Sequence, residues 1–215
     1  MEPTSEQVIT EVRPQGKSAR RLEVLVGGEV ALEVDREVAA QHRLSPGRSL
    51  TGSQLEAVRA AGEAYDAGQA ALRLLGSRPR SRVELTRALR AKRFPAAAVE
   101  VALQRLQDVG LVDDAAFARR RAEELTAGRG LGRYAVARKL AQAGIHGEAS
   151  QAALAGTGGE EGELERARQA ADKYLRRGGA GDPRARVKLY QFLARRGFES
   201  DLCRQVTEEK LAAPD

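Results

Sequence analysis

The sequence predicts a mainly helical protein of tandem three-helix modules that follow a small antiparallel β region, and three observations support this fold class. A helical phrase with apolar residues four apart occurs three times, at residues 81–89, 132–140 and 185–193. Successive copies begin 51 and 53 residues apart, a period typical of stacked helical repeats. The region before residue 50 instead alternates apolar and polar side chains, as strands do. We therefore expect the three modules to form an elongated, curved array.

The expected domains are an N-terminal β-hairpin region with a short helix at residues 1–50 and three-helix modules at 51–110, 111–155 and 156–215. Ala, Leu, Arg and Glu dominate, whereas four Tyr, four Phe and no Trp occur. So few aromatic side chains argue against an RNA-recognition sheet or a single-strand-binding barrel. One cysteine, Cys203, excludes an internal disulfide or a cysteine-based zinc site. Without an apolar stretch long enough for a signal peptide or membrane span, we expect a soluble, cytoplasmic monomer that needs no cofactor or membrane.

The N-terminal region is expected to hold two strands, and an earlier one could supply the third member that an isolated hairpin needs. These strands are expected at about residues 22–26 and 30–34, with the earlier one at 8–12. Asp35 follows them and can cap a short helix that ends near His42. Ser45-Pro46-Gly47 then predicts a turn.

The hairpin turn at Gly27-Gly28 leaves two registers open. A two-residue turn would pair Val26 with Glu29 and place the apolar residues of the two strands on opposite faces. A three-residue loop would pair Val26 with Val30 and align them. We favour the longer loop.

From Thr51 onward the start and stop signals are those of helices. Thr51 and Gln54 fit a capping box that opens a long helix ending near Leu75. The helix of the first phrase follows, and Pro95 suits the first turn of a third helix that ends at Gly110. The later modules repeat this order. Their helices are expected at about 114–127, 132–140, 148–154, 160–177, 185–193 and 200–211, with Asp113 as one cap and Asp182-Pro183 as another.

The net charge of +6 is concentrated in the middle of the chain. Residues 51–155 carry +6, whereas 1–50 carry −1 and 156–215 carry +1. The sixteen residues from Arg78 to Arg93 contain seven basic side chains and a single acid, Glu84, which makes them a candidate footprint for an anionic partner. The basic side chains are those of Arg78, Arg80, Arg82, Arg87, Arg90, Lys92 and Arg93.

A second group of candidate contacts lies in the next module, although charged helix faces are often only solvated. It comprises Arg119, Arg129, Arg133, Arg138 and Lys139. In the third module, arginines 176, 177, 184, 186, 195 and 196 have acids nearby and are left out of the candidate site. The repeated Arg82, Arg133 and Arg186 could either hold neighbouring modules together or contact a partner.

Several motifs that could suggest chemistry have a better structural interpretation. Asp113-Asp114 is best explained by helix capping, because no histidine or third carboxylate has matching spacing. Gly130-Leu131-Gly132 follows a helix rather than a strand, so we interpret it as a tight interhelix turn and not as a phosphate-binding loop. Cys203 aligns with Val99 and is expected in the core. No catalytic or metal-binding set emerges.

One set of motifs runs in a fixed order through the middle of the chain. It comprises Arg78-Pro-Arg-Ser81 with Glu84-Leu85 and Leu89, then Leu106 with Gly110-Leu-Val-Asp-Asp114 and Phe117-Ala118, then Gly130-Leu-Gly132 with Leu140 and Gly144-Ile145. In order and spacing, which are more specific than any one piece, this set resembles the RecX family of bacterial recombination regulators. The clear resemblance covers roughly residues 54–155.

This resemblance implies a non-enzymatic protein that binds the RecA recombinase, especially its filament on DNA, and reduces ATP hydrolysis, strand exchange and coprotease action. It thereby implies a role in recombination, DNA repair and the SOS response. The alternative is an autonomous helical DNA-binding protein, and weak direct DNA binding could also accompany RecA binding. The chain departs from its own pattern at Arg93, where the other repeats have Gly144 and Gly197.

Overall fold

The computed structural model describes residues 6–16, 20–179 and 184–212. The chain divides into two compact units. The first unit comprises residues 1–80 and 84–112, and the second comprises residues 81–83 and 113–215. The helix cap expected at Asp182-Pro183 lies outside the described residues.

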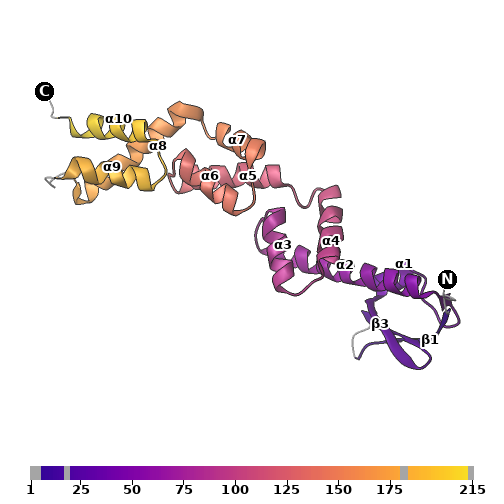
Figure 1. The fold of residues 1–215 in the computed structure, drawn as a ribbon. Helices are drawn as coiled ribbons and strands as arrows, with labels where there is room; N and C mark the ends of the chain where they lie inside the picture. Colours follow the sequence, from indigo (N-terminus) through magenta and orange to yellow (C-terminus); the bar gives the residue numbers. More distant parts are fainter. Residues whose placement is uncertain (1–5, 17–19, 180–183, 213–215) are drawn as a thin grey trace. The chain divides into compact units, whose positions relative to one another are not determined.

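An antiparallel sheet forms the N-terminal part of the first unit (Figure 1). Its strands are β1 (Gln7–Pro14), β2 (Arg21–Val26), β3 (Glu29–Asp35) and β4 (Ser49–Leu50), in the order β3-β2-β1-β4. The expected third strand is therefore present as β1. β4 was not expected, because a strand of two residues has no alternation to reveal it. Ile9, Val24, Val34 and Leu50 are buried together in the sheet core.

The hairpin between β2 and β3 corrects the favoured register. Val26 pairs with Glu29 across a two-residue turn, and the pairing shifts by one residue between Val24 and Leu25. Leu25 pairs with Val30 and Val24 pairs with Leu32, so Ala31 is the extra residue of a β-bulge. The bulge restores the alignment of the apolar faces that the longer loop was meant to provide, and it leaves Val30 exposed.

Asp35 links the sheet to α1 (Arg36–Gln41), as the sequence predicted. Its carboxylate accepts the backbone N–H of Glu37 as an N-cap and forms a 3.0 Å ion pair with Arg20. Desolvation alone would raise the pKa of Asp35, but these hydrogen bonds outweigh it and hold the pKa below its ordinary value. The β region is thus joined to the helical region through a satisfied carboxylate.

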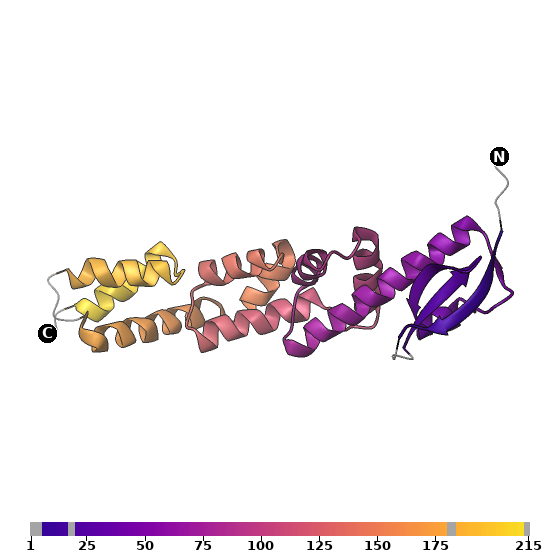
Figure 2. The ribbon, with the colours of Figure 1, turned by 90° about the horizontal axis from the view of Figure 1, so that it is seen from below.

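The long helix α2 (Gly52–Ser77) belongs to two cores of the first unit. Its capping box forms as predicted, with Thr51 and Gln54 exchanging hydrogen bonds. Leu55 and Val58 share a core with the sheet, and Figure 2 shows the start of α2 beside the sheet. Its second half instead packs with α3 (Arg82–Ala91) and α4 (Ala96–Asp108). That helical core contains Ala70, Ala71, Leu85, Leu89, Val99 and Leu103.

The second unit repeats the three-helix order twice. Its helices are α5 (Asp114–Glu123), α6 (Arg133–Gln142), α7 (Gly147–Ala155), α8 (Gly159–Tyr174), α9 (Ala185–Arg195) and α10 (Ser200–Leu211). α5 and α8 continue as the π-helical turns η1 (Glu124–Gly128) and η2 (Leu175–Gly179). The phrase residues lie in the cores, where Val136, Leu140, Leu189 and Leu193 are fully buried. The fold is therefore mainly helical, with three three-helix domains and a small antiparallel sheet.

The turn after each phrase helix has a left-handed residue at the same repeat position. Arg93 has φ 67°, Gly144 has φ 83° and Gly197 has φ 84°. A Cβ at Gly144 or Gly197 would lie closer than 3.0 Å to Val83 or Ala135, respectively. Arg93 is exposed, so its side chain is accommodated. The departure at Arg93 keeps the backbone conformation of the repeat and loses only its tight packing.

Among the described residues, no helix combines the length and the apolar character needed to cross a membrane.

Candidate interaction surface

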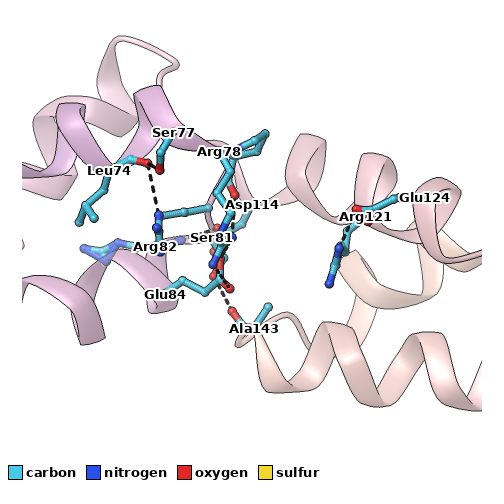
Figure 3. A network of polar contacts seen from close by, with 12 residues as sticks. Leu74, Ser77, Arg78, Ser81, Arg82, Glu84, Asp114, Arg121, Glu124 and Ala143 are labelled. Atoms are coloured by element: carbon cyan, nitrogen blue, oxygen red, sulfur yellow. Dashed lines mark hydrogen bonds and ion pairs between the residues drawn. The ribbon is translucent and has the colours of Figure 1, made fainter. Parts of the chain in front are cut away.

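The seven basic side chains at 78–93 do not form one uniform surface. Arg78 forms two hydrogen bonds of 3.0 and 3.1 Å with the Glu84 carboxylate, and this hydrogen bonding raises the pKa of its guanidinium (Figure 3). Arg80 donates to the carbonyl of Leu74 at 3.3 Å. Both arginines therefore help to shape the turn between α2 and α3.

One group of exposed positive charges in the first unit lies along the second half of α3 and the turn that follows it. Arg87, Arg90, Lys92 and Arg93 are all exposed there. Arg87 has a partner in the chain, whereas the other three form no ion pair with a described residue. Positive charge at a helix C-terminus is favoured by the helix dipole, so stability alone can account for part of this cluster. Its exposure nevertheless makes it available to an anionic partner.

Arg82 and Arg133 act structurally through their backbone N–H groups. The N–H of Arg82 donates to the Asp114 carboxylate at 2.8 Å, and the Ser81 hydroxyl donates to the carbonyl of Ala143 at 2.6 Å (Figure 3). Val83 packs where a side chain at Gly144 would stand. We call this set, which lies within the second unit, the Asp114 junction.

An equivalent set joins the last two modules and is called here the Glu163 junction. The N–H of Arg133 donates to the buried Glu163 carboxylate at 2.8 Å. The N–H of Gly132 donates to the carbonyl of Arg196 at 3.0 Å, and the N–H of Tyr134 donates to that of Gly197 at 3.0 Å. A Cβ on Gly132 would lie closer than 3.0 Å to the Gly197 backbone. At the repeated arginine position, the main-chain N–H therefore holds one module to the next.

The remaining candidate side chains of the second unit differ in how they are held. Arg119 and Arg138 are exposed and Lys139 is half-buried, and none forms an ion pair with a described residue. Arg129 lies 3.9 Å from Glu124, and Arg133 lies 3.9 Å from Glu199. Arg119, Arg138 and Lys139 are therefore the more available cations of this group.

Arg129 also lines a basic groove that the sequence did not reveal. The groove has a volume of about 700 Å³ and lies between η1 with its following turn, α8, η2 and α9. Its basic lining residues are Arg129, Arg166, Lys173, Arg177, Arg195 and Arg196, and none of the described acidic residues lines it. The sequence did not predict this groove because acidic residues lie close to these cations along the chain. In the fold such acids have other partners, as Asp172 does in its 2.9 Å ion pair with Lys210.

The motifs interpreted as structural do have structural roles. Asp113 caps α5 by accepting the N–H of Ala116 at 2.8 Å, and its neighbour Asp114 serves the junction described above. Gly130 lies in a left-handed turn with φ 58°. Cys203 is fully buried in the core of the third module, and burial raises its pKa to about 11.

Comparison with family models finds the three helical domains in order along the chain. The first three-helix domain of RecX matches residues 67–106, the second matches 113–154 and the third matches 161–207. Each range falls on one set of three helices described above.

Individual relatives agree with these matches. Regulatory protein RecX of Thermobifida fusca is 40% identical over 144 residues, which cover 66% of this chain and 77% of the relative. The protein of the same name from Streptomyces coelicolor is 38% identical over 142 residues, covering 65% and 74%. A crystal structure of regulatory protein RecX matches with a TM-score of 0.74 and 26% identity over 95% of this chain and 98% of that chain. RecX from Lactobacillus salivarius matches in fold, with a TM-score of 0.62 and 22% identity over 69% and 97%.

Proposed function

Because this chain belongs to the RecX family of regulatory proteins, we propose that it binds the RecA recombinase, above all its filament on DNA, and inhibits it. Inhibition would lower ATP hydrolysis, strand exchange and coprotease activity without chemistry of its own, in the cytoplasm. The observation that carries this proposal is the ordered match of all three helical domains to the RecX domains.

The charge distribution supports a polymeric, anionic partner. Successive helical modules expose side chains from several repeats, which suits a partner that itself repeats. Arg90, Lys92 and Arg93 are exposed on the first unit, and none is in an ion pair with a described residue. We therefore assign these three the leading role in contact with RecA or its DNA. Arg78 and Arg80 come second, because they form hydrogen bonds with Glu84 and Leu74 of the same chain.

The proposal is tested by adding the full chain to RecA on single-stranded DNA and following ATP turnover. We expect turnover to fall at ratios of chain to RecA at or below one to one. Unchanged turnover at these ratios would contradict the proposed function.

The site is tested by reversing Arg90, Lys92 and Arg93 to Glu together. A matched control reverses Arg36, Arg73 and Arg105 to Glu, which are exposed on the same unit and change the net charge equally. We expect the first variant to lose about tenfold in inhibition and the control to lose less than about twofold, because a contact depends on local charge. Equal losses would show that only net charge matters.

A further inference from the structure

The basic groove of the second unit has the composition of an anion-binding site. Five of its six cations, namely Arg166, Lys173, Arg177, Arg195 and Arg196, form no ion pair with a described residue. Arg129 shares Glu124 with Arg121, which lies closer to that carboxylate, at 2.6 Å against 3.9 Å. Such a concentration of one sign in a concave surface attracts and holds ligands of the opposite sign.

Two of these arginines are fixed by carbonyl groups rather than by carboxylates. Arg166 donates to the carbonyl of Thr157 at 2.7 Å, and Arg196 donates to that of Arg129 at 2.9 Å. The buried Nε atom of each has no acceptor among the described residues. Desolvation lowers the pKa of Arg166, with nearby Glu163 opposing the shift. Holding such a charge without a direct ion pair costs stability, which an anionic ligand would restore.

Aromatic rings at the same groove narrow the class of ligand. Tyr174 and Phe192 both line it and stack on each other with centroids 4.8 Å apart. The Arg196 guanidinium lies 5.2 Å from the Phe192 centroid. Bases stack on aromatic rings and on guanidinium planes, whereas an acidic peptide makes no particular use of them. Guanidinium forks also match phosphate oxygens in geometry.

The size of the groove favours a single strand over a duplex. A volume of about 700 Å³ lies within the usual range for small-ligand pockets. A double helix is too wide to enter, and its bases are already stacked and paired. An unpaired strand can place a base or a few phosphates inside. The π-helical turns η1 and η2 both contribute to the lining, and π-helical turns are frequent at functional sites.

We propose that the basic groove between η1, α8, η2 and α9 binds the phosphodiester backbone of single-stranded DNA, with Tyr174 and Phe192 beside a base. This site belongs to the second unit, whereas the cations assigned above belong to the first. It goes beyond the proposed function, because it predicts DNA binding by the chain in the absence of RecA.

The test is direct binding of the full chain to a fluorescein-labelled oligo(dT), followed by anisotropy over a series of salt concentrations. The groove variant replaces Lys173 and Arg177 by Gln. Its matched control replaces Arg176 and Arg120 by Gln, which are also exposed cations of the second unit but do not line the groove. All four side chains are exposed, so both variants are expected to retain the helical circular dichroism of the parent.

We expect the groove variant to bind oligo(dT) about tenfold more weakly and the control less than about twofold more weakly. The slope of log affinity against log salt concentration is negative. Its magnitude should decrease by about 0.7 for each groove cation removed, which is the value per neutralised phosphate of a single strand. Equal weakening of the two variants would overturn the site.

Competition separates the two possible anionic ligands. Unlabelled oligo(dT) is expected to displace the probe at least about tenfold better than poly-glutamate of equal charge. Equal displacement would overturn the assignment to DNA in favour of an acidic protein segment, and no binding of oligo(dT) would overturn the site altogether. RecA inhibition by the same preparation is measured in parallel, so a failure here is distinguishable from a failure of the proposed function.

Discussion

The Asp114 junction and the Glu163 junction use the same positions of the repeat but different atoms. In both, a carboxylate accepts the backbone N–H of the repeated arginine at 2.8 Å. In both, the carbonyl before the turn glycine also accepts a hydrogen bond. Ser81 supplies it from its hydroxyl at the Asp114 junction, whereas Gly132 supplies it from its main-chain N–H at the Glu163 junction.

The difference sets how closely the two backbones approach. A hydroxyl extends beyond the main chain, so Ser81 reaches the Ala143 carbonyl with its side chain. A main-chain N–H has no such reach, and Gly132 must lie directly against the Gly197 backbone. One repeat position thus keeps its hydrogen bond while changing the donor. The Glu163 junction should consequently tolerate added atoms less well.

The largest expected effect comes from adding a methyl group at each turn glycine. Gly197→Ala would place Cβ against the backbone and Cβ of Ala135, which cannot move aside, and we expect a loss of about 3 kcal/mol in the free energy of unfolding. Gly144→Ala would meet only the Val83 side chain, and we expect about 2 kcal/mol. Urea unfolding followed by circular dichroism measures both.

Gly130→Ala is the control for backbone strain alone, since φ is 58° there and no atom lies within 4 Å of the added Cβ. It should cost about 1 kcal/mol. If all three variants lost the same amount, conformation and not packing would explain the turn glycines.

The next largest effects compare the stability that the Glu163 and Asp114 carboxylates contribute. Glu163→Ala would leave the Arg133 N–H without its acceptor and remove a negative charge that favours the charged form of Arg166, and we expect a loss of about 2 kcal/mol. Asp114→Ala removes a more exposed carboxylate and should cost about 1 kcal/mol. Unfolding free energies of the two variants test the order, and hydrogen exchange at the start of α6 should rise only in the first. The reverse order would mean that burial does not set the strength of these contacts.

A smaller effect tests the donor at the Asp114 junction. Ser81→Ala removes the hydroxyl and leaves the Ala143 carbonyl without this donor in a buried site. We expect a loss of about 1 kcal/mol in the free energy of unfolding. Ser77→Ala is the control, because the Ser77 hydroxyl bonds the Leu74 carbonyl of its own helix, which keeps Arg80 as a second donor. Equal losses would show that the interhelix contact adds nothing beyond a local hydrogen bond.

Contacts between neighbours in sequence could be predicted from the sequence, whereas contacts between distant segments could not. The phrase residues, the Thr51 capping box and the Asp35 cap depend on neighbours in sequence, so their patterns predicted them. The bulge at Ala31 was missed because two registers satisfied the same turn residues. Asp114 was expected to act with Asp113 as a helix cap, but its carboxylate accepts the backbone N–H of Arg82, which is 32 residues away in sequence. The basic groove was missed because its cations come from four segments that only the fold brings together.

The smallest predicted effect concerns Arg93, where the first module departs from the glycine of the other two. Arg93→Gly would relieve a left-handed arginine, worth about 1 kcal/mol, but glycine would lose about 0.5 kcal/mol more backbone entropy on folding. We therefore expect a net gain of about 0.5 kcal/mol, measured by urea unfolding. Arg43→Gly is the control, because Arg43 also has positive φ, at 50°, outside the repeats. A gain at both positions would show that glycine is favoured by positive φ in any turn. The requirement for glycine at the other two repeat turns would then come from the segments that pack on them, Val83 and Ala135. A loss at Arg93 alone would show instead that its side chain stabilises the turn, so that the first module would have exchanged the tight packing at Gly144 and Gly197 for a contact made by arginine itself.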